Sequence, residues 1–135
     1  MRRVTILVIE QGAEAGLVCA ALALRPEVRV VDSPHLGEAL ERLDKHPGPV
    51  ALAIAGATAL AGSADELVTR LGARGIPVIG VAAGLAPAAR QHALAAGVRE
   101  IHDRPTQWRP YSKLIDSLVS RFIPAGLPPR PDRTS

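Results

Sequence analysis

Side chains able to do chemistry stand where the apolar runs of this 135-residue chain end. Glu10 and Gln11 follow the first run, and a carboxylate is the kind of hard oxygen ligand that a divalent cation prefers. Arg104 follows the last run, and its guanidinium is a planar donor suited to carboxylates. The third and fourth runs end at Ala55 and Ala82, which carry no polar side-chain atom. Because ligands of open parallel sheets bind beyond the carboxyl ends of the strands, these five positions are the first candidates for a site.

Catalysis by a nucleophile or by a paired acid and base finds little support in the sequence. No histidine has a Ser or Cys partner at motif spacing, and we expect all four to lie on the surface: His35, His46, His92 and His102. Cys19 stands in an Ala- and Leu-rich segment, which favours a small packed residue. No cluster with metal-ligand spacing appears. We therefore expect neither an enzyme nor a bound metal or cofactor.

Two glycines after the first run keep small-ligand or nucleotide binding as an alternative. Gly12-Ala-Glu-Ala-Gly16 has the spacing G-x-x-x-G and lacks the G-x-G-x-x-G pattern that lets the backbone approach a pyrophosphate. Asp32, after the second run, is the acidic residue that such a site would use.

Five short apolar runs alternate with helical patterns along the chain. The runs are Val4–Ile9, Val28–Val31, Val50–Ala55, Ile76–Ala82 and Val98–His102. Several are apolar on both faces, as parallel strands covered by helices on each side would be. This alternation predicts an α/β fold with a doubly wound, five-stranded parallel sheet, right-handed crossovers and five helices.

Capping residues predict where two of the helices begin. Ser33 can cap a helix with Pro34 at its first position, and its inward residues would be Leu36, Leu40 and Leu43. Ser63 and Glu66 form a capping box before the next apolar stripe.

The last two helices and the end of the chain have clearer boundaries. Pro87 and Gly97 bound the fourth helix, and Pro110 opens the fifth. The inward stripe of the fifth helix is Tyr111, Leu114, Ile115, Leu118, Val119 and Phe122. Residues 124–135 include four prolines and little to bury, so we expect one domain over 1–123 followed by a disordered tail or linker.

Composition indicates a soluble, cytoplasmic protein. Hydrophobic residues make up 47% and charged residues 21% of the chain, and the apolar runs are too short to span a membrane. The single cysteine excludes an internal disulfide. The net charge of +3 is scattered and aromatic residues are few, which argues against a nucleic-acid interface.

Four segments together resemble the response-regulator receiver (CheY-like) family. The segment Ile6-Leu7-Val8-Ile9-Glu10-Gln11 resembles its first strand and acidic pair, and Pro49 to Ala55 resembles its third strand. Ile76-Pro77-Val78-Ile79-Gly80-Val81-Ala82-Ala83 resembles its fourth strand, and Ala93-Leu94-Ala95-Ala96-Gly97-Val98 followed by Arg104-Pro105 resembles its ending. The resemblance covers about residues 3–122 and implies a flavodoxin-like fold with strand order 2-1-3-4-5.

The chain departs from the family at the residues on which phosphorylation depends. In the family these are an acidic pair that binds Mg²⁺, an acceptor Asp, a hydroxyl, a Lys and an aromatic switch residue. The matching positions here are Glu10 with Gln11, Ala55, Ala82, Arg104 and Ile101. No Asp or Glu lies between Gly48 and Ala64, so a small shift in alignment does not restore an acceptor.

The resemblance and its departures together predict a pseudo-receiver, which signals by binding a protein instead of by being phosphorylated. The partner would be a signalling kinase, an effector or a second copy of the chain. The alternative is a phosphorelay receiver with an unusual acceptor such as Thr58 or Ser63.

Two further expectations concern single contacts. Glu10 and Arg104 would form an ion pair across the mouth of the degenerate pocket, or else remain two partly solvated side chains of little energetic weight. Partners of the family usually bind the face of the fourth helix, fifth strand and fifth helix. The candidate interface here is Arg90, Gln91, Arg99, Trp108 and Arg109. Trp108 would be either an interface anchor or a cap on the core at the start of the last helix.

Overall fold

The computed structural model describes residues 4–10, 12–45 and 48–122, with the backbone alone for residues 12–14. Strands and helices alternate along the chain as predicted. In order they are β1 (Val4–Ile9), α1 (Gly12–Leu22), β2 (Val28–Ser33), α2 (Leu36–Lys45), β3 (Val50–Ala55), α3 (Ala57–Gly72), β4 (Val78–Ala82), α4 (Pro87–Ala96), β5 (Glu100–Asp103) and α5 (Trp108–Phe122). The predicted tail lies outside the described residues.

One sheet holds all five strands, with every neighbouring pair parallel. The strand order is β2-β1-β3-β4-β5, which confirms the predicted doubly wound order. The register places Ile9 beside Ser33 on one side and beside Ala55 on the other. Ala82 pairs with Asp103, so all five parallel strands have their carboxyl ends at the same edge of the sheet.

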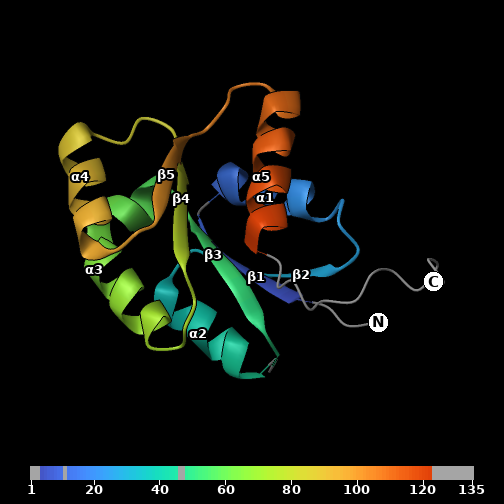
Figure 1. Ribbon diagram of the computed structural model, residues 1–135, viewed down its shortest axis with the longest axis horizontal. Coiled ribbons are helices and arrows are strands. Elements are labelled where there is room, and N and C mark those ends of the chain that lie inside the picture. Colours follow the sequence, from blue (N-terminus) through green and yellow to red (C-terminus); the bar gives the residue numbers. More distant parts are fainter. Residues whose placement is uncertain (1–3, 11, 46–47, 123–135) are drawn as a thin grey trace.

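Apolar side chains alternate between the two faces of the sheet and form two cores. Leu7 and Ile9 of β1 pack with α2, α3 and α4 on one face, and Val8 packs with α1 and α5 on the other. Figure 1 shows this division, with α1 and α5 together on one side of the sheet and α2, α3 and α4 on the opposite side. Because each face is covered, the strands are apolar on both faces.

One predicted helix start is wrong, and another falls at a kink where two helical segments meet. Ser33 is the last residue of β2, and α2 begins at Leu36, so Ser33 is not its cap. The Ser33 hydroxyl instead accepts a hydrogen bond from the His35 backbone N–H at 3.2 Å and donates one to Glu38 at 2.5 Å. α3 begins at Ala57, and Ser63 lies at a kink inside it with φ −152° and ψ 36°. The capping pattern therefore marks the kink in this helix and not its start.

The boundaries of α4 are confirmed, and α5 is longer than expected. α4 runs from Pro87 to Ala96, and Gly97 follows with φ 121°, a left-handed conformation that favours glycine. A Cβ at Gly97 would stand 2.7 Å from Val68 of α3, so the two helices approach closely there. α5 begins at Trp108, two residues before Pro110, and most of its predicted inward stripe is buried.

Among the residues that the structure describes, no helix is both long enough and apolar enough to cross a membrane.

Candidate functional site

The carboxyl ends of β1, β3, β4 and β5 bring four of the five predicted pocket residues to one edge of the sheet. The Gly56 N–H donates to the Ile9 carbonyl at 3.0 Å, which ties the end of β3 to the end of β1. The Arg104 N–H donates to the Ala82 carbonyl at 3.0 Å, which ties the residue after β5 to β4. Glu10, Ala55, Ala82 and Arg104 therefore share this edge, and Gln11 lies outside the described residues.

The carboxyl group of Glu10 lies directly over Gly56. Glu10 is buried, with 8% of its surface exposed. A Cβ added to Gly56 would stand only 1.5 Å from Glu10 Oε2 and 2.4 Å from Oε1, so the carboxylate fills the space of a side chain at position 56. Gly56 is the residue that precedes α3. The carboxylate thus stands at the N-terminus of a helix, where the partial positive charge of the backbone stabilises an anion.

The inner wall of this edge is hydrocarbon. Ala55 and Ala82 are almost fully buried, and so is Leu60 from the first turn of α3. A Cβ at Gly80 of β4 would stand 2.6 Å from Leu60 Cδ1, so Leu60 packs closely onto the sheet. Because α3 begins directly after Gly56, its first turn carries Leu60 into the core beneath the strand ends.

Arg104 is half-buried and follows β5 at the same edge as Glu10. Its backbone is fixed by the bond to Ala82, which brings the base of the side chain to this edge. The ion pair between Glu10 and Arg104 stays a prediction. Within the described part of the chain, no three His, Cys, Asp or Glu residues are grouped so that they could hold a metal ion.

The two proposed unusual acceptors lie on α3, beside the edge. Thr58 is exposed in the first turn. Ser63 is half-buried at the kink, and its hydroxyl donates to the Ala59 carbonyl at 3.3 Å. Both line an open groove of about 430 Å³ between α3 and the start of α2, which also includes His35 and Glu66.

Polar contacts join β5 to the helices on both sides of the candidate interface. Arg90 of α4 donates to the Ile101 carbonyl at 2.9 Å and to Asp103 at 2.7 Å. On the other side, Arg121 of α5 makes two bonds of 2.7 Å to the carboxylate of Glu100. These contacts fix α4 and α5 against the edge strand, and half-buried Arg90 thereby has a role in the fold itself.

On the face of α4, β5 and α5, Glu100 is the residue whose pKa its neighbours shift most. His102 also contacts it, with 2.7 Å between His102 Nε2 and Glu100 Oε1. The hydrogen bonds from Arg121, and then from His102, lower the pKa of Glu100 from 4.5 to about 2. A planar guanidinium with two parallel bonds to one carboxylate is the stronger of the two partners.

The remaining candidate interface residues are exposed. Gln91, Arg99 and Arg109 all lie on the surface. Trp108 is 45% exposed, and its ring lies 6.2 Å from that of Tyr111 at an angle of 53°. The exposed position favours an interface role for Trp108 over a cap on the core.

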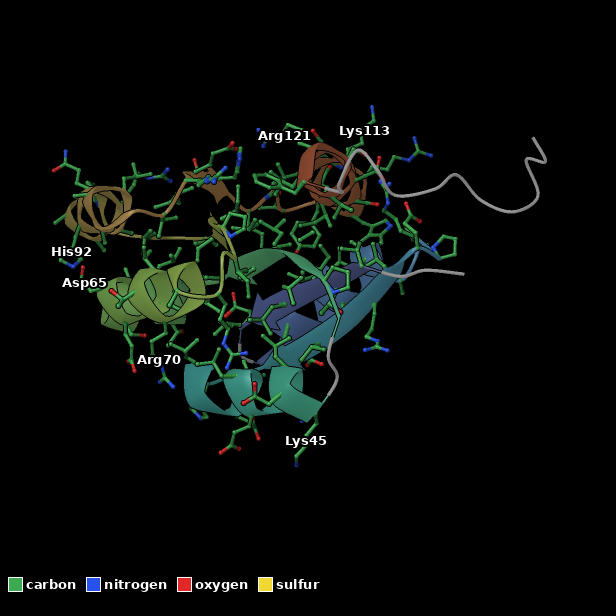
Figure 2. All side chains as sticks on the ribbon, turned by 60° about the horizontal axis from the view of Figure 1, so that its bottom comes forward. Lys45, Asp65, Arg70, His92, Lys113 and Arg121 are labelled. Atoms are coloured by element: carbon green, nitrogen blue, oxygen red, sulfur yellow. The ribbon has the colours of Figure 1, made fainter. Side chains whose placement is uncertain are left out.

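The other reactive residues of the sequence stay apart from the edge of the sheet. His92 of α4 contacts Asp65 of α3 at 2.9 Å, and the two side chains face one another in Figure 2. Cys19 of α1 is half-buried, and burial, followed by the negative charge of Asp32, raises the pKa of its thiol. A thiol with a raised pKa is a weaker nucleophile at neutral pH.

Solved structures of similar fold identify the fold class of this chain. No protein-family model matches the chain, and no curated protein matches its sequence. The phosphorylated cyanobacterial phytochrome response regulator RcpA is similar in structure, with a TM-score of 0.72 and 15% identity over 95% of this chain and 99% of that one. An orphan response regulator of H. pylori has a TM-score of 0.68 and 16% identity, over 91% of this chain and 100% of that one.

A response regulator receiver protein from Burkholderia phymatum is also similar, with a TM-score of 0.64 and 21% identity over 93% of this chain and all of that one. Together these structures show that the chain has the CheY-like, flavodoxin-like fold of receiver domains. Identities this low establish the fold alone, so the chemistry of the site rests on the residues themselves.

The close approach of Glu10 to Gly56 predicts the effect of one added methyl group. We expect Gly56→Ala to destabilise the protein by about 1–3 kcal/mol, because the methyl group displaces the buried carboxylate. Gly62→Ala, on the same helix, meets nothing within 4 Å and should be neutral or stabilising by up to about 1 kcal/mol. Denaturant unfolding measures both.

A double-mutant cycle then assigns the cause of that loss. A Glu10→Ala background has no carboxylate at this position. In that background Gly56→Ala should lower the free energy of unfolding much less. An equal cost of Gly56→Ala in both backgrounds would contradict the contact.

The lowered pKa of Glu100 predicts how stability changes with acid. A folded-state pKa below the unfolded one stabilises the protein at pH values above 4.5, and this contribution is lost as the pH falls toward 2. The difference in unfolding free energy between wild type and Glu100→Gln should therefore shrink over that range. Arg121→Met should remove most of the same pH dependence. A wild-type advantage over Glu100→Gln that stays constant down to pH 2 would refute the assignment.

Proposed function

We propose that this protein is a pseudo-receiver, a domain with the receiver fold that acts in signal transduction by binding a protein and is not itself phosphorylated. The observation that carries the proposal is the end of β3, where Ala55 and Gly56 offer hydrocarbon and the Glu10 carboxylate fills the adjoining space. An acyl phosphate needs a carboxylate at this point, and an alanine side chain has no oxygen to accept the phosphoryl group.

The oxygen ligands at this edge also fit Mg²⁺ poorly. Mg²⁺ needs near-octahedral coordination by hard oxygen atoms, usually from carboxylates, phosphates and water. Of the described pocket residues only Glu10 carries a carboxylate, and that group lies buried against Gly56 at the start of α3. To bind an ion, Glu10 would have to leave a position in which the helix N-terminus stabilises its charge.

Protein binding is the activity that remains for such a domain, and the face of α4, β5 and α5 is the proposed docking surface. Trp108 gives this face an exposed aromatic side chain, and Arg99 and Arg109 add positive charge. Trp and Arg are the residue types most often found to dominate binding energy at protein interfaces. We propose a signalling kinase or an effector as the partner for this face and expect no enzymatic activity of the domain.

Treatment with a small phosphodonor and Mg²⁺ tests the absence of phosphorylation. Intact-mass spectrometry should show no added phosphoryl group, because the acceptor position is Ala55. A conventional receiver domain treated in parallel is the positive control. A phosphoryl group that Thr58→Ala or Ser63→Ala removes would overturn the proposal and favour a receiver with an unusual acceptor.

The exposure of Trp108 predicts that the residue contributes little to stability. Trp108→Ala should lower the free energy of unfolding less than truncation of a buried residue does, because Trp108 is 45% exposed and its contact with Tyr111 adds only about 0.5–1.5 kcal/mol to the area it buries. Leu118→Ala, a buried control on the same helix, should cost about 2–5 kcal/mol. A Trp108→Ala loss as large as that of Leu118→Ala would show that Trp108 belongs to the core.

A further inference from the structure

Strand β2 forms one edge of the sheet, and among the described residues it pairs with β1 alone. Figure 1 shows β2 and β5 at opposite ends of the sheet. On the inner side of β2, the carbonyls of Glu27 and Ser33 accept bonds of 3.0 and 3.3 Å from backbone N–H groups at the two ends of β1. Because backbone groups alternate in direction along a strand, those of Val30 and Asp32 point away from β1. These outward N–H and C=O groups can pair with an added strand.

The two edge strands differ in length and in the pairing of the charges beside them. β2 has six residues, whereas β5 has only four, and a short edge strand offers little backbone to an added chain. Arg90 and Arg121, which flank β5, are paired with Asp103 and Glu100 of that strand. The arginines beside β2 are available for a partner, as the groove next to that strand shows.

A groove of about 440 Å³ lies against β2 and is lined by Arg29, Val30, Val31 and Arg42. Both arginines are exposed, and neither makes an ion pair with another described residue. No acidic residue of the described chain lines this groove. A guanidinium is a planar donor that suits a carboxylate, so two of them beside outward backbone groups favour an extended acidic chain.

The alternation of side chains along β2 determines the pattern that such a chain would need. Val31 packs on the face of the sheet that α2 covers, and Arg29 points to the same face. Val28 and Val30 pack on the face that α1 covers. The side chains of an added strand alternate in the same way. Acidic residues at every second position would therefore lie beside Arg29 and Arg42, and apolar residues between them would lie beside Val30.

A second copy of this chain fits the edge poorly. A two-fold axis that pairs two β2 strands edge to edge keeps both copies of α2 on the same face of the sheet. Arg29 and Arg42 of both chains would then lie together on that face, and like charges placed opposite one another destabilise a strand pair. Charge complementarity thus favours a segment of a different protein.

We propose that β2 binds an extended segment of another protein, in which acidic and apolar residues alternate, as a sixth strand of the sheet. The backbone of that segment bonds to the outward groups of Val30 and Asp32, and its carboxylates pair with Arg29 and Arg42. In strand addition, backbone bonds supply affinity and alternate side chains supply specificity. This site lies at the opposite edge from β5, so it goes beyond the proposed function and does not depend on whether the domain is phosphorylated.

Backbone amide NMR with a synthetic peptide of eight residues, alternating Glu and Val, tests the site. Saturable shifts should centre on Val30 and Asp32, whose amides gain hydrogen bonds. A peptide with Lys in place of every Glu should bind at least about tenfold more weakly, because it meets the arginines with like charge. Methylation of all backbone nitrogens of the Glu and Val peptide should abolish binding, since strand addition needs a backbone that donates.

Charge reversals on the protein locate the site. Arg29→Glu and Arg42→Glu should each weaken binding of the Glu and Val peptide by about tenfold, through loss of a charge-assisted bond. Arg99→Glu is the matched control, because Arg99 is an exposed arginine beside the other edge strand. It should bind the peptide like the wild type. All three variants should keep the wild-type melting temperature, since none of these side chains is buried.

Three results would overturn the proposal. The first is the absence of saturable shifts at millimolar peptide. The second is a loss of binding in Arg99→Glu as large as that in Arg29→Glu, which would place the site elsewhere. The third is a single-stranded oligonucleotide that shifts Val30 and Asp32 when the peptide does not, which would make the edge a nucleic-acid site. None of these results changes the outcome expected with the phosphodonor.

Discussion

The contact between the Glu10 carboxylate and Gly56 is the interaction on which the edge of the sheet depends. It brings a charged group from the end of β1 onto the first residue before α3, where the backbone lacks a capping side chain of its own. A side chain at position 56 would overlap the carboxylate where it now lies, so one of the two would have to shift. The contact therefore joins the residue after β1 to the residue before α3.

Several features of the site follow from that early helix start. Because α3 begins at Ala57, Leu60 falls in its first turn and packs on Gly80 of β4, so the space beneath the strand ends is filled with hydrocarbon. Accessible polar and aromatic groups lie in the groove that Thr58 lines beside this edge, and along the side of the sheet at Trp108 and the ion pairs of β5. In the proposed function, the partner protein would bind at these surfaces, and the edge of the sheet would take no part in phosphate chemistry.

Much of the fold could be predicted because its determinants are local. The strands Val4–Ile9 and Val50–Ala55 and the helix Pro87–Ala96 match their predicted bounds, since apolar runs, Pro87 and Gly97 act over a few residues. The start of α3 could not be predicted, because Gly56 precedes it without a side-chain cap and the neighbouring Glu10 is distant in sequence. The exposed side of α1 could not be predicted for a different reason: from residue 15 to residue 22 the helix has no charged residue, and so no periodicity shows which side is exposed.

A Mg²⁺ titration monitored by backbone amide NMR tests most directly whether the Glu10 carboxylate stays against Gly56 or binds the ion. We expect the amide resonances of Glu10, Gly56, Ala82 and Arg104 to keep their positions at millimolar Mg²⁺. Saturable shifts centred on these residues, with a submillimolar dissociation constant, would contradict it.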